Sequence, residues 1–103
     1  MKIERPHSFS KDEAVGRIRA LTDYWQNSYG IRTDWQGDTA RVKGKVKGIS
    51  FDGTFTVTDR QLEADVKVGF LAEKLGGRDY VERKLADYLD AKNTLEELQA
   101  RTR

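Results

Sequence analysis

The chain has 103 residues, with 19 lysines and arginines against 17 aspartates and glutamates, and its formal net charge is +2. A chain of this length forms one domain that buries about 65% of its unfolded surface, which leaves little volume for a deep site. Cysteine is absent, which excludes disulfides and thiolate metal sites and suits a cytoplasmic protein. Apolar runs never exceed three residues, so we expect neither a membrane span nor a secretory signal.

The N-terminal part predicts a short strand followed by a long helix. Residues 2–5 are the strand candidate, and Pro6 ends it because proline has no N–H for a sheet ladder. Ser10 and Glu13 have the spacing of a capping box, which predicts a helix starting at this point. Apolar side chains then recur at helical spacing, at Ala14, Ile18, Leu21 and Trp25. Gly30 is a natural left-handed stop, so we expect the helix to end after residue 29.

The middle of the chain changes from a period of 3.6 to a period of two. Four segments alternate apolar with polar side chains, at residues 31–36, 40–47, 50–57 and 62–68. Such segments form an antiparallel meander with one covered face. The loops between them are predicted at residues 37–38, 48–49 and 58–61. The resulting cross-strand partners are Trp35 with Ala40, Gly44 with Gly53, Lys45 with Asp52, and Phe55 with Ala64.

A second helix is predicted from about Asp79, after a break at Gly76 and Gly77. Its apolar stripe consists of Val81, Leu85, Tyr88, Ala91, Leu95 and Leu98. Thr94 and Glu97 form a further capping-box pattern, so the helix can also break and restart near Asn93.

These elements predict an α+β fold. The first strand would run antiparallel to the last strand of the meander, and we place it beside that strand. The result is a five-stranded antiparallel sheet with two helices packed on one face, a helix-grip-like arrangement. Residues 1–90 are expected to form the single domain, and residues 91–103 a helical extension or a frayed tail.

Residues that could perform catalysis are few. His7 is the only histidine, and we interpret it as a solvated or locally hydrogen-bonded turn residue. Asp52, Glu63 and Asp65 share the polar face of the sheet, where neighbouring lysines predict ordinary ion pairs rather than acid–base chemistry. We therefore expect no enzyme activity, no catalytic residues, no metal and no cofactor.

Three sets of residues are candidates for binding. Gly44 and Gly53, with Trp25 and Trp35, could border a small apolar cavity between helices and sheet. A second candidate is an apolar contact patch made of Phe70, Leu71, Leu95 and Leu98. The third is a basic row that could face an anionic partner, made of Arg41, Lys43, Lys45 and Lys47. No aromatic residue is interleaved in that row, which argues against nucleic acid.

Several stretches together resemble one family. They are Arg5-Pro6-His7-Ser8-Phe9-Ser10, Tyr29-Gly30-Ile31, Trp35-Gln36-Gly37-Asp38, Phe51-Asp52-Gly53 and Val68-Gly69-Phe70-Leu71. In their order and spacing they are similar to the polyhydroxyalkanoic acid system family of small bacterial proteins, over residues 3–90. The resemblance implies a role in the storage polyester system and supplies no catalytic residues.

The leading hypothesis is therefore a non-enzymatic accessory protein of polyhydroxyalkanoate granules. Its partner would be the granule surface, a granule-associated protein or an apolar acyl compound, and its location the cytoplasm, at the granule surface. The C-terminal helix could also support self-association. The alternatives are a carrier of a small apolar ligand between helices and sheet, and a weak single-stranded nucleic-acid binder that uses the basic row.

Overall fold

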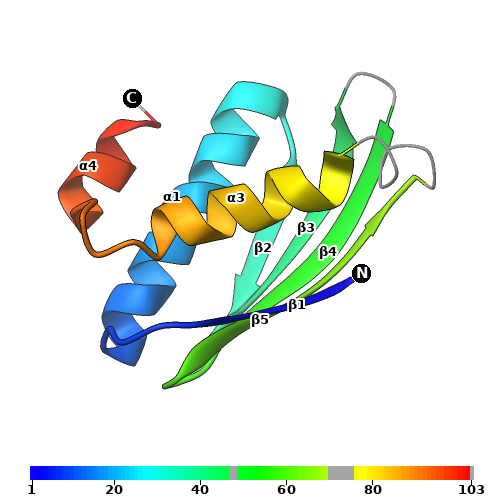
Figure 1. The fold of residues 1–103 in the computed structure, drawn as a ribbon. Helices are drawn as coiled ribbons and strands as arrows, with labels where there is room; N and C mark the ends of the chain where they lie inside the picture. Colours follow the sequence, from blue (N-terminus) through cyan, green and yellow to red (C-terminus); the bar gives the residue numbers. More distant parts are fainter. Residues whose placement is uncertain (47–48, 70–75, 103) are drawn as a thin grey trace.

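The computed structural model describes residues 1–46, 49–69 and 76–102. Its elements in chain order are β1 (Lys2–Pro6), α1 (Lys11–Tyr29), β2 (Arg32–Gln36), β3 (Thr39–Val46), β4 (Ile49–Val57), β5 (Gln61–Val68), α3 (Arg78–Tyr88) and α4 (Leu95–Ala100). The strands form one antiparallel sheet in the order β1-β5-β4-β3-β2, with the helices on one of its faces (Figure 1). The predicted α+β fold and the position of the first strand beside the last are confirmed.

Helix α1 begins and ends where its sequence signals predict. The Ser10 hydroxyl accepts a hydrogen bond from the backbone N–H of Glu13 at 3.1 Å, which satisfies one of the free donors of the first turn. Gly30 ends the helix with a φ of 69°, in the left-handed region that glycine adopts without steric cost. The side of α1 that faces the sheet is buried through Ala14, Ile18, Leu21 and Trp25.

Two of the three predicted hairpin registers are confirmed. Trp35 lies opposite Ala40, and Phe55 lies opposite Ala64. The β3–β4 register differs from the prediction by two residues, because Gly44 lies opposite Phe51 and not opposite Gly53. A shift of two residues leaves every side chain on the same face, so the apolar pattern could not distinguish the two registers.

The core lies between the sheet and the two long helices. Every second residue along the central strands is buried, through Ala40, Val42, Phe55, Val57, Leu62, Ala64 and Val66. Trp25 from α1 packs onto this surface, with its ring centroid 5.6 Å from that of Phe55 and 5.8 Å from that of Phe51. Helix α3 contributes its own buried side, Val81, Leu85 and Tyr88.

The C-terminal segment is a separate short helix that packs onto α1. The helical stripe predicted across the break stops at α3, so Ala91 is exposed. Helix α4 then starts at the predicted capping box, in which Thr94 Oγ1 accepts from Glu97 N at 3.1 Å. Leu98 has none of its surface exposed, and a side chain added at Gly16 of α1 would contact Leu95. In Figure 1, α4 is the red helix beside α1.

Candidate functional site

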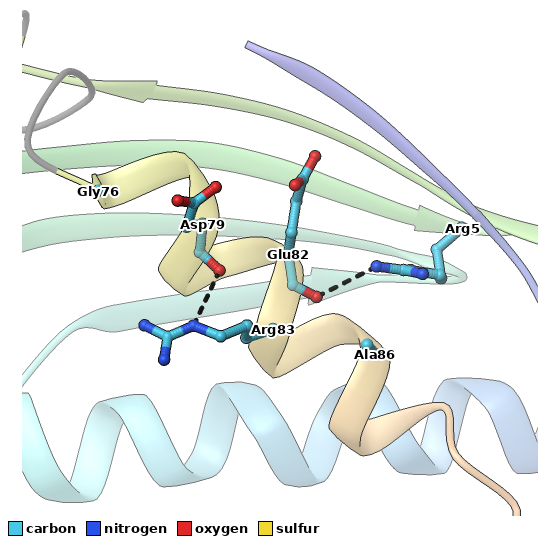
Figure 2. Close-up of a pocket in the computed structure, with 6 residues that line it drawn as sticks. All are labelled: Arg5, Gly76, Asp79, Glu82, Arg83 and Ala86. Carbon is cyan, nitrogen blue, oxygen red and sulfur yellow. Dashed lines mark hydrogen bonds between the residues drawn. The ribbon is translucent and has the colours of Figure 1, made fainter.

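A groove lies between the edge strand β1 and helix α3, with a volume of about 610 Å³. Figure 2 shows the residues that line it, which are Arg5, Gly76, Asp79, Glu82, Arg83 and Ala86. Arg5 is two residues from the buried Ile3, so its side chain is on the helix face of the sheet, where it reaches toward α3. Alternation along β1 could have identified this inward arginine, but it was not among the candidate residues.

The charged groups of the groove are mostly engaged with the backbone or with each other. Arg5 Nη2 donates to the carbonyl of Glu82 at 3.3 Å, and Arg83 Nε donates to the carbonyl of Asp79 at 3.4 Å. The Glu82 carboxylate pairs with Arg78 at 3.2 Å. Arg5 Nε is buried without a hydrogen-bond partner. Since that atom is covered by protein, it is not a donor that a ligand in the groove can reach.

His7 is held in place by hydrogen bonds from both ring nitrogens. Nδ1 accepts from the backbone N–H of Phe9 at 3.2 Å, which leaves Nε2 to donate to the carbonyl of Thr58 at 2.9 Å. The imidazole therefore ties the end of β1 to the β4–β5 turn. The contact with Phe9 is the local hydrogen bond predicted for His7, whereas the contact with Thr58 joins residues 51 positions apart in the chain.

The predicted carboxylates lie on the exposed face of the sheet among basic residues. Asp52 lies between Lys43 and Lys67 on the neighbouring strands, and it pairs with Arg41 at 3.6 Å. The prediction that Lys45 faces Asp52 is wrong, because the β3–β4 register places Lys45 opposite Ser50. Asp65 and Glu63 are exposed on β5, across from Thr54 and Thr56.

The basic row is exposed on the same face. Arg41, Lys43 and Lys45 all point to solvent from β3, while Lys47 lies outside the described residues. Arg32 of β2 lies beside Lys43 and adds a further positive charge. The nearby Asp52 reduces the net charge, so the row is a mixed face with an excess of cations.

The structure describes two of the four residues of the predicted apolar patch, Leu95 and Leu98. Leu98 is buried against the core and is not available to a partner, and Leu95 is half-buried beside α1. Phe70 and Leu71 lie outside the described residues. The apolar side of α4 packs against its own chain, so this packing does not support self-association through the helix.

Other residues occupy the space directly beside two of the residues predicted to border a cavity, Gly44 and Gly53. A Cβ atom added at Gly44 would lie 3.2 Å from the Cα of Ile31, and one added at Gly53 would lie 3.3 Å from a methyl group of Val66. Trp25 is 1% exposed and packs on the sheet, and the Trp35 ring nitrogen donates to Thr22 Oγ1 at 3.2 Å. These contacts occupy the space directly beside Gly44 and Gly53, and the cavity itself stays a prediction.

The structure also reveals a cluster that sequence reasoning missed, and we call it the tyrosine patch. It consists of Tyr24 and Tyr29 from α1 with Tyr80 and Lys84 from α3. The rings of Tyr24 and Tyr29 meet edge to face at 6.2 Å, and Lys84 Nζ lies 4.8 Å from the centre of the Tyr24 ring. Tyr29 is 41% exposed. The spacing of Tyr80 and Lys84 places them one helical turn apart, but nothing in the sequence indicates that α1 faces them.

The tyrosine patch is anchored to the core through Tyr80. Its hydroxyl accepts a hydrogen bond from the ring nitrogen of Trp25 at 3.2 Å. Burial raises the pKa of Tyr80 to about 12, so this phenol keeps its hydrogen throughout the physiological range. The patch therefore presents aromatic surface together with hydrogen-bond donors.

Within residues 1–46, 49–69 and 76–102, no three histidine, aspartate or glutamate side chains are placed to hold a metal ion. In the same part of the chain, no helix has the length and apolar character needed to cross a membrane.

A protein-family model for polyhydroxyalkanoic acid system proteins of the granule region matches residues 1–92. The chain belongs to this family. The match extends from β1 through α3 and ends before α4, so the helix that packs on α1 lies beyond the part shared with the family. Neither the curated proteins nor the solved structures give a significant match.

Proposed function

We propose that this family member is a non-enzymatic accessory protein of the polyhydroxyalkanoate storage granule, acting in the cytoplasm at the granule surface. It would act by binding the granule surface, a granule-associated protein or an apolar acyl compound. The observation that carries the proposal is the family match over residues 1–92, which includes the whole sheet and both long helices.

The described side chains support binding rather than catalysis. A general base must reach a proton of the substrate, and both nitrogens of His7 are already engaged with the backbone. Asp52 is surrounded by cations on an open face, where water stabilises its charge. These contacts give each candidate group a structural role.

Among the three kinds of partner, the packing favours a surface over an enclosed ligand. A carrier needs an internal volume bordered by apolar side chains. Gly44 and Gly53, the residues that suggested such a volume, are covered by Ile31 and Val66. A partner would therefore be contacted from outside the core.

The test uses the purified full chain with amorphous poly(3-hydroxybutyrate) particles in moderate salt. We expect the protein to sediment with the particles and to stay in the supernatant without them. A fluorescently tagged copy should collect at granules in cells that contain them. Equal amounts in the supernatant with and without particles, together with diffuse fluorescence, would contradict binding to the granule surface.

A second candidate is weak binding of single-stranded nucleic acid through the basic row. It is favoured by the exposure of Arg41, Lys43 and Lys45 on one strand beside Arg32. Binding of this kind weakens steeply with salt, because it depends on release of counterions from phosphates. Absence of binding to a labelled oligonucleotide at low salt would dismiss this candidate.

A further inference from the structure

The tyrosine patch has a hydrogen-bonding character that distinguishes it from the other surfaces. Its four side chains carry three phenol hydroxyls and one ammonium group, so they supply donors on an aromatic surface. The β1–α3 groove, in contrast, contains Asp79 and Glu82, and the open face of the sheet contains Asp52 and Asp65. An ionised carboxylate accepts hydrogen bonds but cannot donate one.

An aliphatic polyester presents the complementary chemistry. Its surface consists of methyl and methylene groups and of ester carbonyl oxygens, which accept hydrogen bonds, and donors occur only at chain ends. A protein surface that fits it therefore combines apolar contact area with donors. Tyrosine supplies both in one side chain, which is why it is common where an apolar phase meets water.

We propose that the tyrosine patch is the surface by which this protein docks on the storage polyester. The inference rests on the proposed function and names the face of the molecule that performs it. The contacts would be made by the rings of Tyr24 and Tyr29, with the Tyr29 hydroxyl and the Lys84 ammonium donating to ester carbonyls.

The patch is organised before any partner arrives, which lowers the entropic cost of binding. Tyr24 and Tyr29 are set at 88° to each other, and Lys84 Nζ lies 5.9 Å from the Tyr80 ring as well as 4.8 Å from the Tyr24 ring. Trp25 donates to the Tyr80 oxygen, which holds the Tyr80 side chain in place. A tyrosine side chain has few rotatable bonds, so little conformational entropy is lost when it makes a contact.

The experiment measures sedimentation of the full chain with poly(3-hydroxybutyrate) particles and with polystyrene particles of the same size. The variants are Tyr29→Ser, Tyr29→Phe and Lys84→Ser, and Arg41→Ser on the open sheet face is the matched control. Tyr29 is exposed and Lys84 is half-buried, and circular dichroism with thermal melting checks that each variant is folded. The affinity for polyester should fall about tenfold in Tyr29→Ser, as for a central contact residue of an interface.

The remaining variants separate hydrogen bonding from apolar contact. Tyr29→Phe should weaken binding to polyester by a smaller factor and leave binding to polystyrene unchanged, because only polyester has acceptors. Arg41→Ser should bind as the unsubstituted chain does. If Tyr29→Ser and Lys84→Ser bind polyester with full affinity, the tyrosine patch is not the docking surface, although the proposed function stands. If the unsubstituted chain itself fails to bind, the surface-binding proposal and this inference both fail.

Discussion

Arg17 shows how one buried charge can organise a small domain. Its side chain is 3% exposed, and Nη1 donates to the carbonyls of Tyr88 and Asp90 at 3.1 and 3.2 Å. Nε contacts the Glu13 carboxylate at 3.0 Å, and the guanidinium carbon lies 3.9 Å from the centre of the Phe9 ring. The arginine of α1 thus satisfies carbonyls at and just beyond the C-terminal end of α3.

We expect Arg17→Ala to destabilise the fold by about 3 kcal/mol, because a buried carbonyl and a partly buried one lose their donor and the ion pair is broken. Urea unfolding monitored by tryptophan fluorescence would measure the change. Arg32→Ala, at an exposed position on β2, is the control and should change stability by less than about 0.5 kcal/mol. Equal effects of the two substitutions would contradict the structural role of Arg17.

Gly44 is a second position where a single residue decides the packing. An added Cβ would lie 3.2 Å from the Cα of Ile31, and the backbone can yield only by moving the start of β2. Gly44→Ala should therefore destabilise by about 1–3 kcal/mol. Gly69→Ala is the matched control, because nothing lies within 4 Å of its added Cβ. Thermal melting should separate the two variants, and a neutral Gly44→Ala would refute the close contact.

Among the elements, α4 lies beyond the residues matched by the family and still contributes Leu98 to the core. Its short length gives little intrinsic helical stability, so the helix depends on its packing against α1. Besides Leu98, it is held by an ion pair between Arg101 and Asp87 at 2.6 Å and by a hydrogen bond from Asn27 to the carbonyl of Thr102 at 2.8 Å. These contacts explain an ordered helix beyond the part matched by the family.

Leu98→Ala should reduce the stability of the whole domain by about 2–3 kcal/mol, because it opens a void at a fully buried site. Gln99→Ala, on the exposed side of the same helix, should leave the unfolding midpoint nearly unchanged. Chemical denaturation of both variants measures the difference. A Leu98→Ala protein as stable as the unsubstituted chain would indicate that α4 does not contribute to the fold.

The ion pair that holds α4 predicts a dependence on acid. The hydrogen bond from Arg101 holds the pKa of Asp87 below its ordinary value of 3.8. The contribution of this ion pair to the free energy of unfolding is therefore complete above pH 3.8, and it is lost as the pH falls through the lowered pKa of Asp87. Because Asp87 and Arg101 are both about one-third exposed, we expect the ion pair to add only about 0.5 kcal/mol to the free energy of unfolding.

Asp87→Asn should remove this part of the acid dependence, as measured by denaturant midpoints between pH 5 and pH 2. Glu96→Gln, at an exposed position on α4, serves as the control for removing one carboxylate. If the two variants show the same midpoints across this range, the ion pair contributes nothing.

At the scale of the whole molecule, burial of tyrosines between helices and sheet predicts alkaline sensitivity. Burial raises the pKa of Tyr80 to about 12 and also raises that of Tyr88. A phenol whose pKa is higher in the folded state stabilises the fold below the unfolded pKa of about 10, and this stability is lost as the pH rises toward 12. Denaturant midpoints should therefore fall above pH 10.

Tyr80→Phe is the informative variant for this prediction. It removes the phenol but keeps the ring, so the decline in midpoint between pH 10 and pH 12 should become shallower. Tyrosine ultraviolet absorption should show one fewer group titrating late. An unchanged profile would mean that Tyr80 is more solvated than its contacts indicate.

The kinds of element, their order and the face that each presents are encoded locally in the amino-acid sequence. Periodicity is a local property, so alternation in β3 and helical spacing in α1 follow from neighbouring residues alone. The caps at Ser10, Gly30 and Thr94 are local too, and each forms, although the Glu13 carboxylate pairs with Arg17 and does not complete the capping box predicted at Ser10. Family resemblance over most of the domain was also visible in the order of short motifs.

Tertiary packing settles two kinds of feature, those that depend on distant contacts and those for which alternatives leave the apolar pattern unchanged. The β3–β4 register is a feature whose alternatives leave the apolar pattern unchanged, since a shift of two residues keeps each side chain on the same face of the sheet. Other features depend on distant contacts. The burial of Leu98 and the close contact at Gly44 are of this kind, because both depend on how elements far apart in the chain pack. The tyrosine patch does as well: Trp25 and Tyr80 are 55 residues apart, and no local pattern encodes which sides of two helices meet.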